Sequence, residues 1–243
     1  FTKELFKNKS RTSLSYVDDA KRRFYRPVNL LELLKLKREY AGSQLIAGGT
    51  DLTQRGGEAE CMSLISLEGV KELNEIITTE EAWEIGAAVP LTEIAEQLGH
   101  ECQTFDKIMR RFGSRAVRNR ATLGGYLATA WETGQLTPLL MALNARVTLL
   151  SEDGERDAPI SKFYTEGGGT ILTTDEVIRS IIIPRHTEST LSDRGITTRL
   201  CDTYTVAPRR TLCEPYATGG FAVELRDRKI AKAWIAYSGI DKH

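Results

Sequence analysis

The fold is decided by two stretches that each contain a pair of glycines, LIAGGTDL at residues 45–52 and RNRATLGG at residues 118–125. Because glycine has no Cβ atom, such a pair lets main-chain N–H groups approach a ligand closely. Successive N–H groups form a concave site for an anion such as a pyrophosphate, and Thr50 can add a hydroxyl donor. Neither stretch has the P-loop or the G-x-G-x-x-G pattern. Taken alone, the first stretch favours a simple tight turn over a ligand site.

Size and composition exclude several classes of protein. The chain has 243 residues, enough for one large domain or two modest ones, and 41% of them are hydrophobic. Its 33 basic residues balance 33 acidic ones, so the net charge gives no indication of a nucleic-acid or membrane partner. The longest apolar runs are far too short to cross a bilayer, and the first residues do not resemble a signal peptide. We therefore expect a cytoplasmic protein that binds neither nucleic acid nor a membrane.

The cysteines and histidines give no indication of a metal or catalytic site. Cys61, Cys102, Cys201 and Cys213 are widely spaced, and none forms a C-x-x-C pair. Their density is too low for a disulfide scaffold, so we expect free thiols. The three histidines are scattered, and no obvious acid or base stands beside either glycine pair. We expect no metal ligands and no catalytic side chain on this chain.

One basic segment, residues 107–120, directly precedes the second glycine pair. Such a run is commonly the solvated face of a helix. Its position makes a role facing a phosphate or a partner an equal alternative. The basic residues are Lys107, Arg110, Arg111, Arg115, Arg118 and Arg120.

The predicted elements mix helices and strands. Asn29 is a good N-cap for a helix through Tyr40, and a short strand at 44–47 leads directly into the first glycine pair. Thr92 is expected to cap a helix that ends near Leu98. Further helices are expected at 105–112, 127–130 and 138–144, and strands at 62–67, 83–86, 147–150, 177–183, 202–206, 220–225 and 233–237.

Three segments are expected to be irregular. Residues 1–23 are polar and basic and are predicted to be a linker or an arm on a partner, 56–60 a loop, and 185–195 a linker. The chain stops directly after the last predicted strand, where a further helix would normally cover the sheet. We therefore expect a fragment or a missing tail.

Four blocks, in this order, carry a resemblance to a known family: Tyr25–Pro27, 45–52, 118–125 and Glu176–Pro184. The chain resembles the FAD-binding subunit or domain of molybdenum hydroxylases such as xanthine dehydrogenase and carbon monoxide dehydrogenase. The segment GAAVPL at 86–91 matches the family's strand-to-helix connection. The resemblance covers residues 24–185 well and 186–240 more loosely.

The resemblance implies an α+β fold. A PCMH-type FAD-binding domain at 24–185 would have two lobes, about 24–78 and 79–185. A smaller α+β domain at 195–243 would resemble the C-terminal domain of the carbon monoxide dehydrogenase flavoprotein, and we expect it to be incomplete in this chain.

The same resemblance implies where FAD would lie. The first stretch would wrap the pyrophosphate and ribityl groups, Phe112 and Gly113 would border one end, and Ile178 would pack near the isoalloxazine. Because neither stretch contains histidine, the FAD is expected to be non-covalent. The implied FAD-binding residues are Leu45, Ile46, Ala47, Gly48, Gly49, Thr50, Asp51, Leu52, Phe112, Gly113, Thr122, Gly124, Gly125, Thr129 and Ile178.

The sequence departs from the family pattern near the flavin end of the implied site. Tyr126 stands where the family commonly has Asn, and the segment WETGQ at 131–135 has Gln135 where an Asp is usual. Thr205 replaces a Lys often found on the first strand of the last domain. These changes leave the pyrophosphate-binding stretches unchanged and alter the implied flavin-ring contacts.

The function implied by the resemblance is electron transfer. Electrons would arrive from a [2Fe–2S] cluster and leave through FAD to NAD⁺ or another acceptor. The iron–sulfur and molybdopterin groups would lie on partner chains or segments, which makes a hetero-oligomer the expected assembly. Two alternatives remain open: a non-catalytic assembly subunit with an altered flavin site, and a different flavoenzyme on the same fold, such as an oxidase or a reductase of a cell-wall precursor.

Overall fold

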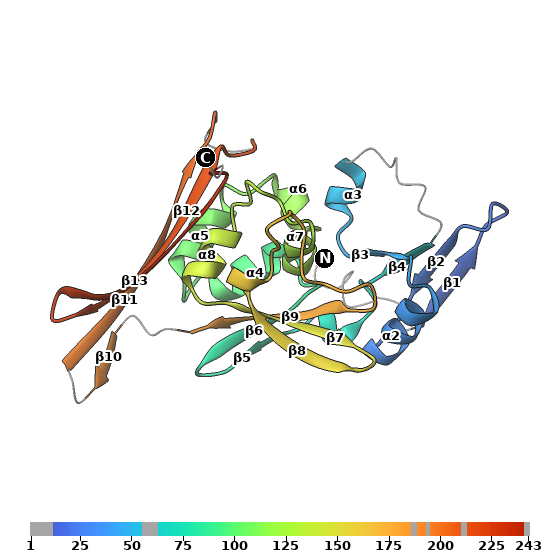
Figure 1. The fold of residues 1–243 in the computed structure, drawn as a ribbon, viewed down its shortest axis with the longest axis horizontal. Coiled ribbons are helices and arrows are strands. Elements are labelled where there is room, and N and C mark those ends of the chain that lie inside the picture. The colour runs from blue at the N-terminus through green and yellow to red at the C-terminus, as the bar shows by residue number, and fades with distance from the viewer. Residues whose placement is uncertain (1–11, 55–62, 186–188, 193–194, 210–212, 241–243) are drawn as a thin grey trace.

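The computed structural model describes residues 12–54, 63–185, 189–192, 195–209 and 213–240, which form three sheets and a layer of short helices (Figure 1). The loop expected at 56–60 lies outside the described residues. The first sheet has the order β1-β2-β4-β3, with β2 and β3 both parallel to β4. Its strands are β1 (Leu14–Val17), β2 (Arg23–Arg26), β3 (Gln44–Ile46) and β4 (Ser63–Ser66).

Helix α2 (Leu30–Glu39) packs against the first sheet. The side chain of Asn29 accepts a hydrogen bond from the Glu32 N–H at 2.9 Å, which confirms the predicted N-cap. Leu33 of α2, Ile65 of β4 and Leu73 form a small core that is fully buried. The short helix α3 (Thr50–Gln54) follows β3, and the 3₁₀ turn η1 (Lys71–Leu73) follows β4.

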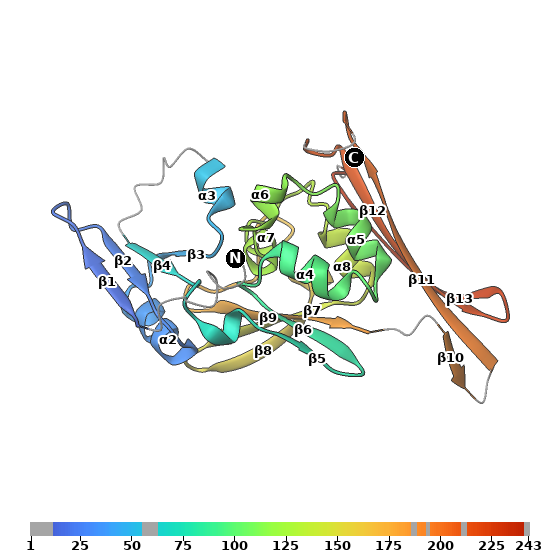
Figure 2. The same ribbon diagram turned by 180° about the vertical axis from the view of Figure 1, so that it is seen from behind.

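A second, five-stranded antiparallel sheet forms the centre of the molecule, in the order β5-β6-β9-β7-β8 (Figure 2). Five helices cover one face of it, and a second 3₁₀ turn, η2 (Ile160–Lys162), follows β8. The strands are β5 (Ile76–Thr78), β6 (Ala82–Gly86), β7 (Arg146–Ser151), β8 (Gly154–Pro159) and β9 (Val177–Pro184). The helices are α4 (Leu91–Leu98), α5 (Gln103–Met109), α6 (Arg115–Arg118), α7 (Leu123–Ala128) and α8 (Thr137–Ala142).

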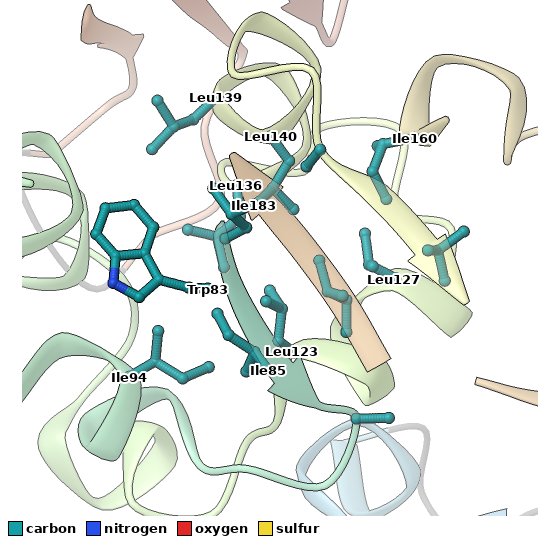
Figure 3. Packing of buried hydrophobic residues seen from close by; sticks show 14 of the residues in the cluster. Trp83, Ile85, Ile94, Leu123, Leu127, Leu136, Leu139, Leu140, Ile160 and Ile183 are labelled. Atoms are coloured by element: carbon teal, nitrogen blue, oxygen red, sulfur yellow. The ribbon is translucent and has the colours of Figure 1, made fainter. Parts of the chain in front are cut away.

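The main hydrophobic core lies between this sheet and its helices (Figure 3). Trp83 and Ile85 are two residues apart on β6, so their side chains lie on the same face of the sheet, toward Ile94 of α4 and Leu123 of α7. Burying side chains of this size contributes roughly 1.5–3 kcal/mol each. This core fixes α7, and with it the second glycine pair, relative to the sheet.

The third sheet packs on the outer side of the helical layer, against α5 and α8 (Figure 1). Its antiparallel strands are β10 (Ser189–Ser192), β11 (Gly195–Val206), β12 (Ala217–Arg226) and β13 (Lys229–Ser238). At Gly220 a Cβ atom would lie 2.3 Å from the Pro138 carbonyl carbon, so only glycine lets β12 cross the start of α8.

Four expectations from the sequence need correction. Within the arm predicted over 1–23, residues 14–17 form strand β1, which pairs with β2 and is exposed along its length. Within the linker predicted over 185–195, residues 189–192 form β10. Pro90, not Thr92, occupies the N-cap of α4, and the Thr92 hydroxyl instead donates to Asn119 Oδ1 at 2.8 Å. The second glycine pair lies in the first turn of α7 and not before that helix.

How the chain divides into domains stays a prediction. The sheets separate between η1 and β5, because β5 pairs with β6 in the central sheet. The described part of residues 195–243 consists of strands, with no helix among them. None of the described helices has the length and apolar character needed to span a membrane.

Candidate functional site

A cavity of about 640 Å³ lies where the two glycine stretches meet. All of the first stretch lines it, together with one side of the α6–α7 region and a short segment after β11. Of the residues implied to bind FAD, those that line it are Leu45, Ile46, Ala47, Gly48, Gly49, Thr50, Asp51, Leu52, Phe112, Gly113, Thr122, Gly125 and Thr129. Gly124 and Ile178 do not.

The first stretch turns sharply between β3 and α3. Ile46 is held on β4 because its carbonyl accepts a hydrogen bond from the Leu67 N–H at 2.8 Å. Gly49 then has φ +71°, a backbone conformation that costs other residues energy. A Cβ atom on Gly48 would lie 1.8 Å from the carbonyl oxygen of Arg120. The two stretches are therefore in direct backbone contact, and a side chain at position 48 would separate them.

The second stretch starts helix α7. Thr122 is its N-cap, and the Thr122 hydroxyl oxygen accepts a hydrogen bond from the Gly125 N–H at 3.1 Å. Gly124 faces the central sheet, where its N–H donates to the Ala87 carbonyl at 3.0 Å and its Cβ atom would lie 2.5 Å from Ala87 Cβ. The two glycines therefore have different roles: Gly125 lines the cavity, and Gly124 lets α7 pack closely on the central sheet.

Ile178 lies on β9 in the main core, only 6% exposed. The register of β9 against β7 pairs it with Leu149. Its position is that of a core residue beneath the helices, and the cavity lies elsewhere.

Among the residues that differ from the family pattern, Tyr126, Trp131 and Gln135 lie in the cavity wall. The Tyr126 hydroxyl oxygen accepts hydrogen bonds from the N–H groups of Leu136 at 2.9 Å and Thr137 at 3.2 Å. Burial raises the pKa of Tyr126, so the phenol stays protonated. Its ring meets Phe112 edge-on at a centroid distance of 5.8 Å. The substitution at 126 therefore supplies a buried hydroxyl that holds the start of α8.

The segment Cys213–Pro215 completes the wall from the third sheet. The Thr133 hydroxyl donates to Glu214 Oε1 at 2.9 Å. Two more hydrogen bonds join the loop at 132–134 to the end of β13. The Gly239 N–H donates to the Glu132 carbonyl at 2.9 Å, and the Ser238 hydroxyl donates to the Gly134 carbonyl at 2.8 Å. The segment Cys213–Pro215 is not among the residues predicted to form the site, because no local pattern indicates that a loop so far along the chain returns to the glycine stretches.

The basic side chains of residues 107–120 hold structure near the cavity, and none of them is among the residues that line it. The Arg118 guanidinium donates to the carbonyls of Phe112 and Gly113, both at 2.9 Å, which fixes the turn that the cavity uses. Arg120 pairs with Glu68 at 3.3 Å, across to the first sheet. Of the two alternatives, a direct phosphate contact receives no support at these positions. Within the described part of the chain, no group of three or more His, Cys, Asp and Glu side chains is placed to hold a metal ion.

Comparison with known families identifies the chain. A sequence model of the family described as "FAD binding domain in molybdopterin dehydrogenase" matches residues 19–186, which include both glycine stretches. This chain belongs to that family of FAD-binding domains. Its segment from β10 onward, which forms the third sheet, lies beyond the matched residues.

Relatives of this FAD-binding domain are dehydrogenases and oxidases. Xanthine dehydrogenase 1 of Arabidopsis thaliana is 30% identical over 175 residues, 66% of this chain and 13% of that protein. Aldehyde oxidase 4 of Mus musculus is 33% identical over 173 residues, 65% of this chain and again 13% of the relative. The chain thus spans only a small part of the curated relatives that it matches.

Solved structures show the same fold. Quinoline 2-oxidoreductase from Pseudomonas putida 86 matches with a TM-score of 0.78 and 22% identity, over 89% of this chain and 73% of that chain. Carbon monoxide dehydrogenase from Hydrogenophaga pseudoflava matches with a TM-score of 0.78 and 20% identity, over 88% and 73%. These matches confirm the α+β, PCMH-type fold that the sequence predicts.

Proposed function

We propose that this chain is the FAD-binding electron-transfer module of a molybdenum hydroxylase of the xanthine dehydrogenase type. Electrons enter from a [2Fe–2S] cluster and leave to NAD⁺ or another acceptor. The observation that carries the proposal is the contact between Gly48 and Arg120, which joins two distant glycine stretches in the wall of one cavity. The family match over residues 19–186 supplies the identity of the ligand.

The residues of the cavity fit FAD. A volume of about 640 Å³ lies within the range of roughly 300–1,000 Å³ that ligand sites usually have. Gly49 lines the cavity without a Cβ atom that would cover the main-chain N–H groups of the first stretch, as a pyrophosphate requires. When bound, FAD supplies the one- and two-electron redox chemistry.

In this proposal, the residues of this chain bind FAD, orient it and shield it from water. The first glycine stretch would bind the pyrophosphate with its N–H groups and with the Thr50 hydroxyl. Tyr126 and Trp131 would form an aromatic wall, which excludes water from that part of the cavity. No proton transfer by a side chain is needed in this proposal.

The remaining groups of the enzyme would lie outside this chain. The proposal places the iron–sulfur and molybdenum cofactors on partner chains or other segments, as part of a hetero-oligomer. The described cysteines are free thiols, which supports a cytoplasmic location.

The experiment that tests the proposal is a visible absorption spectrum of the purified chain, followed by heat release and identification of any cofactor. The proposal predicts the absorption bands of oxidised flavin and released FAD in a ratio near one per chain. A colourless protein that also fails to take up added FAD would contradict it. That result would favour an assembly subunit, because Tyr126 and Trp131 stand in the cavity wall.

A further inference from the structure

Two thiols from distant parts of the chain meet between the helical layer and the third sheet. Cys102 lies between α4 and α5, where its N–H donates to the Leu98 carbonyl at 2.8 Å. Cys201 lies on β11, paired with Ala222 of β12. The two side chains lie close enough for each to alter the pKa of the other, and Thr104, two residues after Cys102, is hydrogen-bonded to Cys201. Both side chains pack against the main core and are partly exposed.

Thr104, at the start of α5 and two residues after Cys102, holds Cys201 in place. The Thr104 hydroxyl donates to the Cys201 carbonyl at 2.9 Å and accepts from the Cys201 thiol at 3.4 Å. These two bonds hold β11 against the start of α5, so the position of Cys201 opposite Cys102 is set by the fold.

The surroundings make the two thiols chemically unequal. The neighbouring Cys102 thiol is the main cause that lowers the pKa of Cys201 to about 6, and Thr104 and the positive charge of Arg199 lower it further, against burial and Asp202. The interaction with Cys201 and burial raise the pKa of Cys102. Because the proton leaves Cys201 first, the ionised pair is a thiolate beside a thiol, which is the arrangement that oxidises readily.

We propose that Cys102 and Cys201 are a redox modification site that closes to a reversible disulfide when the protein meets a hydroperoxide. The Cys201 thiolate attacks the peroxide, the O–O bond breaks, and the alcohol or water leaves with a proton, which yields a sulfenic acid. The Cys102 sulfur then attacks the Cys201 sulfur and releases water. Two electrons pass from the sulfurs to the peroxide, and one S–S bond forms.

The cross-link would tie the third sheet to the helical layer. Strand β11 leads into the segment Cys213–Pro215, which lines the cavity, so the bond would fix one part of the cavity wall. The proposal goes beyond the proposed function and holds whether or not FAD binds. It also agrees with a reducing compartment, where disulfides are transient and sense oxidants.

The test is peptide mapping of the full chain after treatment with hydrogen peroxide. Free thiols are blocked by alkylation, and the digest is analysed before and after reduction. The proposal predicts one dominant cross-linked peptide pair, joining Cys102 to Cys201, that disappears on reduction. Because the closed loop is about a hundred residues long, the oxidised protein should unfold at a temperature higher by roughly 5–15 °C.

Serine variants supply the controls. Cys213→Ser should still form the cross-link, and Cys102→Ser should leave a sulfenic acid at Cys201 that a dimedone reagent traps. Cys201→Ser should react with peroxide at Cys102 at least about tenfold more slowly. A dominant cross-link through Cys61 or Cys213, or oxidation of Cys213 without any Cys102–Cys201 bond, would overturn the proposal. Mapping of the unaltered chain decides the point even if a variant fails to fold.

Discussion

Tyr126 joins the wall of the cavity to the helix that supports the third sheet. Its hydroxyl oxygen accepts two main-chain N–H groups, from Leu136 and Thr137, at the start of α8. A buried N–H without an acceptor loses its hydrogen bond with water and gains nothing in return. The hydroxyl at position 126 is therefore a structural requirement of this version of the site.

Replacing Tyr126 with phenylalanine should lower the free energy of unfolding by about 1–3 kcal/mol, because two N–H groups lose their acceptor. The matched control is Tyr164→Phe, since the Tyr164 hydroxyl has only a contact of 3.4 Å with Thr137 Oγ1. That variant should cost less than about 1 kcal/mol. Urea denaturation of both variants measures the difference, and equal losses would refute this role of Tyr126.

At the scale of elements, β8 is joined to the segment before β9 by one ion pair whose carboxylate is shielded from solvent and whose arginine is partly exposed. Arg156 on β8 donates to the two carboxylate oxygens of Glu176 at 2.6 and 2.8 Å, and the Thr173 N–H adds a third bond at 3.0 Å. The Glu176 side chain is only 9% exposed, which separates this pair from the other, exposed pairs on the central sheet. These bonds hold the pKa of Glu176 below its ordinary value, with Arg156 as the main cause.

The sign of the pH effect follows from that lowered pKa. In the unfolded chain Glu176 titrates near its ordinary value of about 4.3. Its contribution to stability is therefore fully present above that pH and is lost as the pH falls through the lower value of the folded protein. Glu176→Gln should lose about 1.5–3 kcal/mol at pH 7 and nearly nothing at strongly acidic pH.

The control for Glu176→Gln is Glu155→Gln on the same strand as Arg156. Glu155 pairs with Arg179, and its side chain is 43% exposed, so this variant should cost less than about 1 kcal/mol at any pH. Thermal unfolding across a pH series measures both variants. A loss in Glu176→Gln that does not shrink in acid would contradict the assignment.

Local patterns predict elements whose signal lies within a few residues. The Asn29 cap and the helix after it are of this kind, as are β6 and β9, where hydrophobic and β-branched residues form the core face. Strand β1 escapes prediction because its four residues stand within a polar, basic segment, and all four are exposed, so no buried face supports the short apolar pattern. Pairing with the neighbouring β2 in a local hairpin creates that strand.

The candidate site divides in the same way. Both glycine stretches are visible in the sequence, because only glycine permits the turn at Gly49 and the contact at Gly48. The opposite orientations of Gly124 and Gly125 are invisible until α7 is known to begin at Thr122. The contribution of Cys213–Pro215 depends on how the third sheet packs on α8, which no sequence pattern specifies.

At the scale of the whole molecule, the cavity connects the first sheet, the helical layer and the third sheet. The first sheet supplies the turn after β3, the helical layer supplies α7 and the loop that follows it, and the third sheet supplies Cys213–Pro215. The bonds from Gly239 and Ser238 to the loop at 132–134 carry this connection to the end of β13. A ligand in the cavity should therefore order segments far apart in the chain.

Hydrogen–deuterium exchange tests this connection. Addition of FAD should slow amide exchange at residues 45–54, at 131–137 and at the end of β13 near Gly239, by about tenfold or more at the glycine stretches. Strand β1, which does not line the cavity, serves as the internal control and should not change. Slowing confined to residues 45–54 would show that the third sheet does not share the site.

The central claim is that the first glycine stretch forms an FAD-binding cavity, and one matched pair of variants tests it most directly. Gly49 and Gly168 have similar positive φ values, +71° and +77°, but only Gly49 lines the cavity. Valine at either position strains the backbone to a similar extent, and a Cβ atom on Gly49 also meets Ile46 Cδ1 at 3.3 Å, so thermal unfolding of both variants is measured beside their affinity. The measurement is the Kd for FAD of Gly49→Val, Gly168→Val and the unaltered chain, by titration of flavin fluorescence. We predict a loss of at least about tenfold in Gly49→Val and no change in Gly168→Val. Equal affinity in all three proteins would contradict the account.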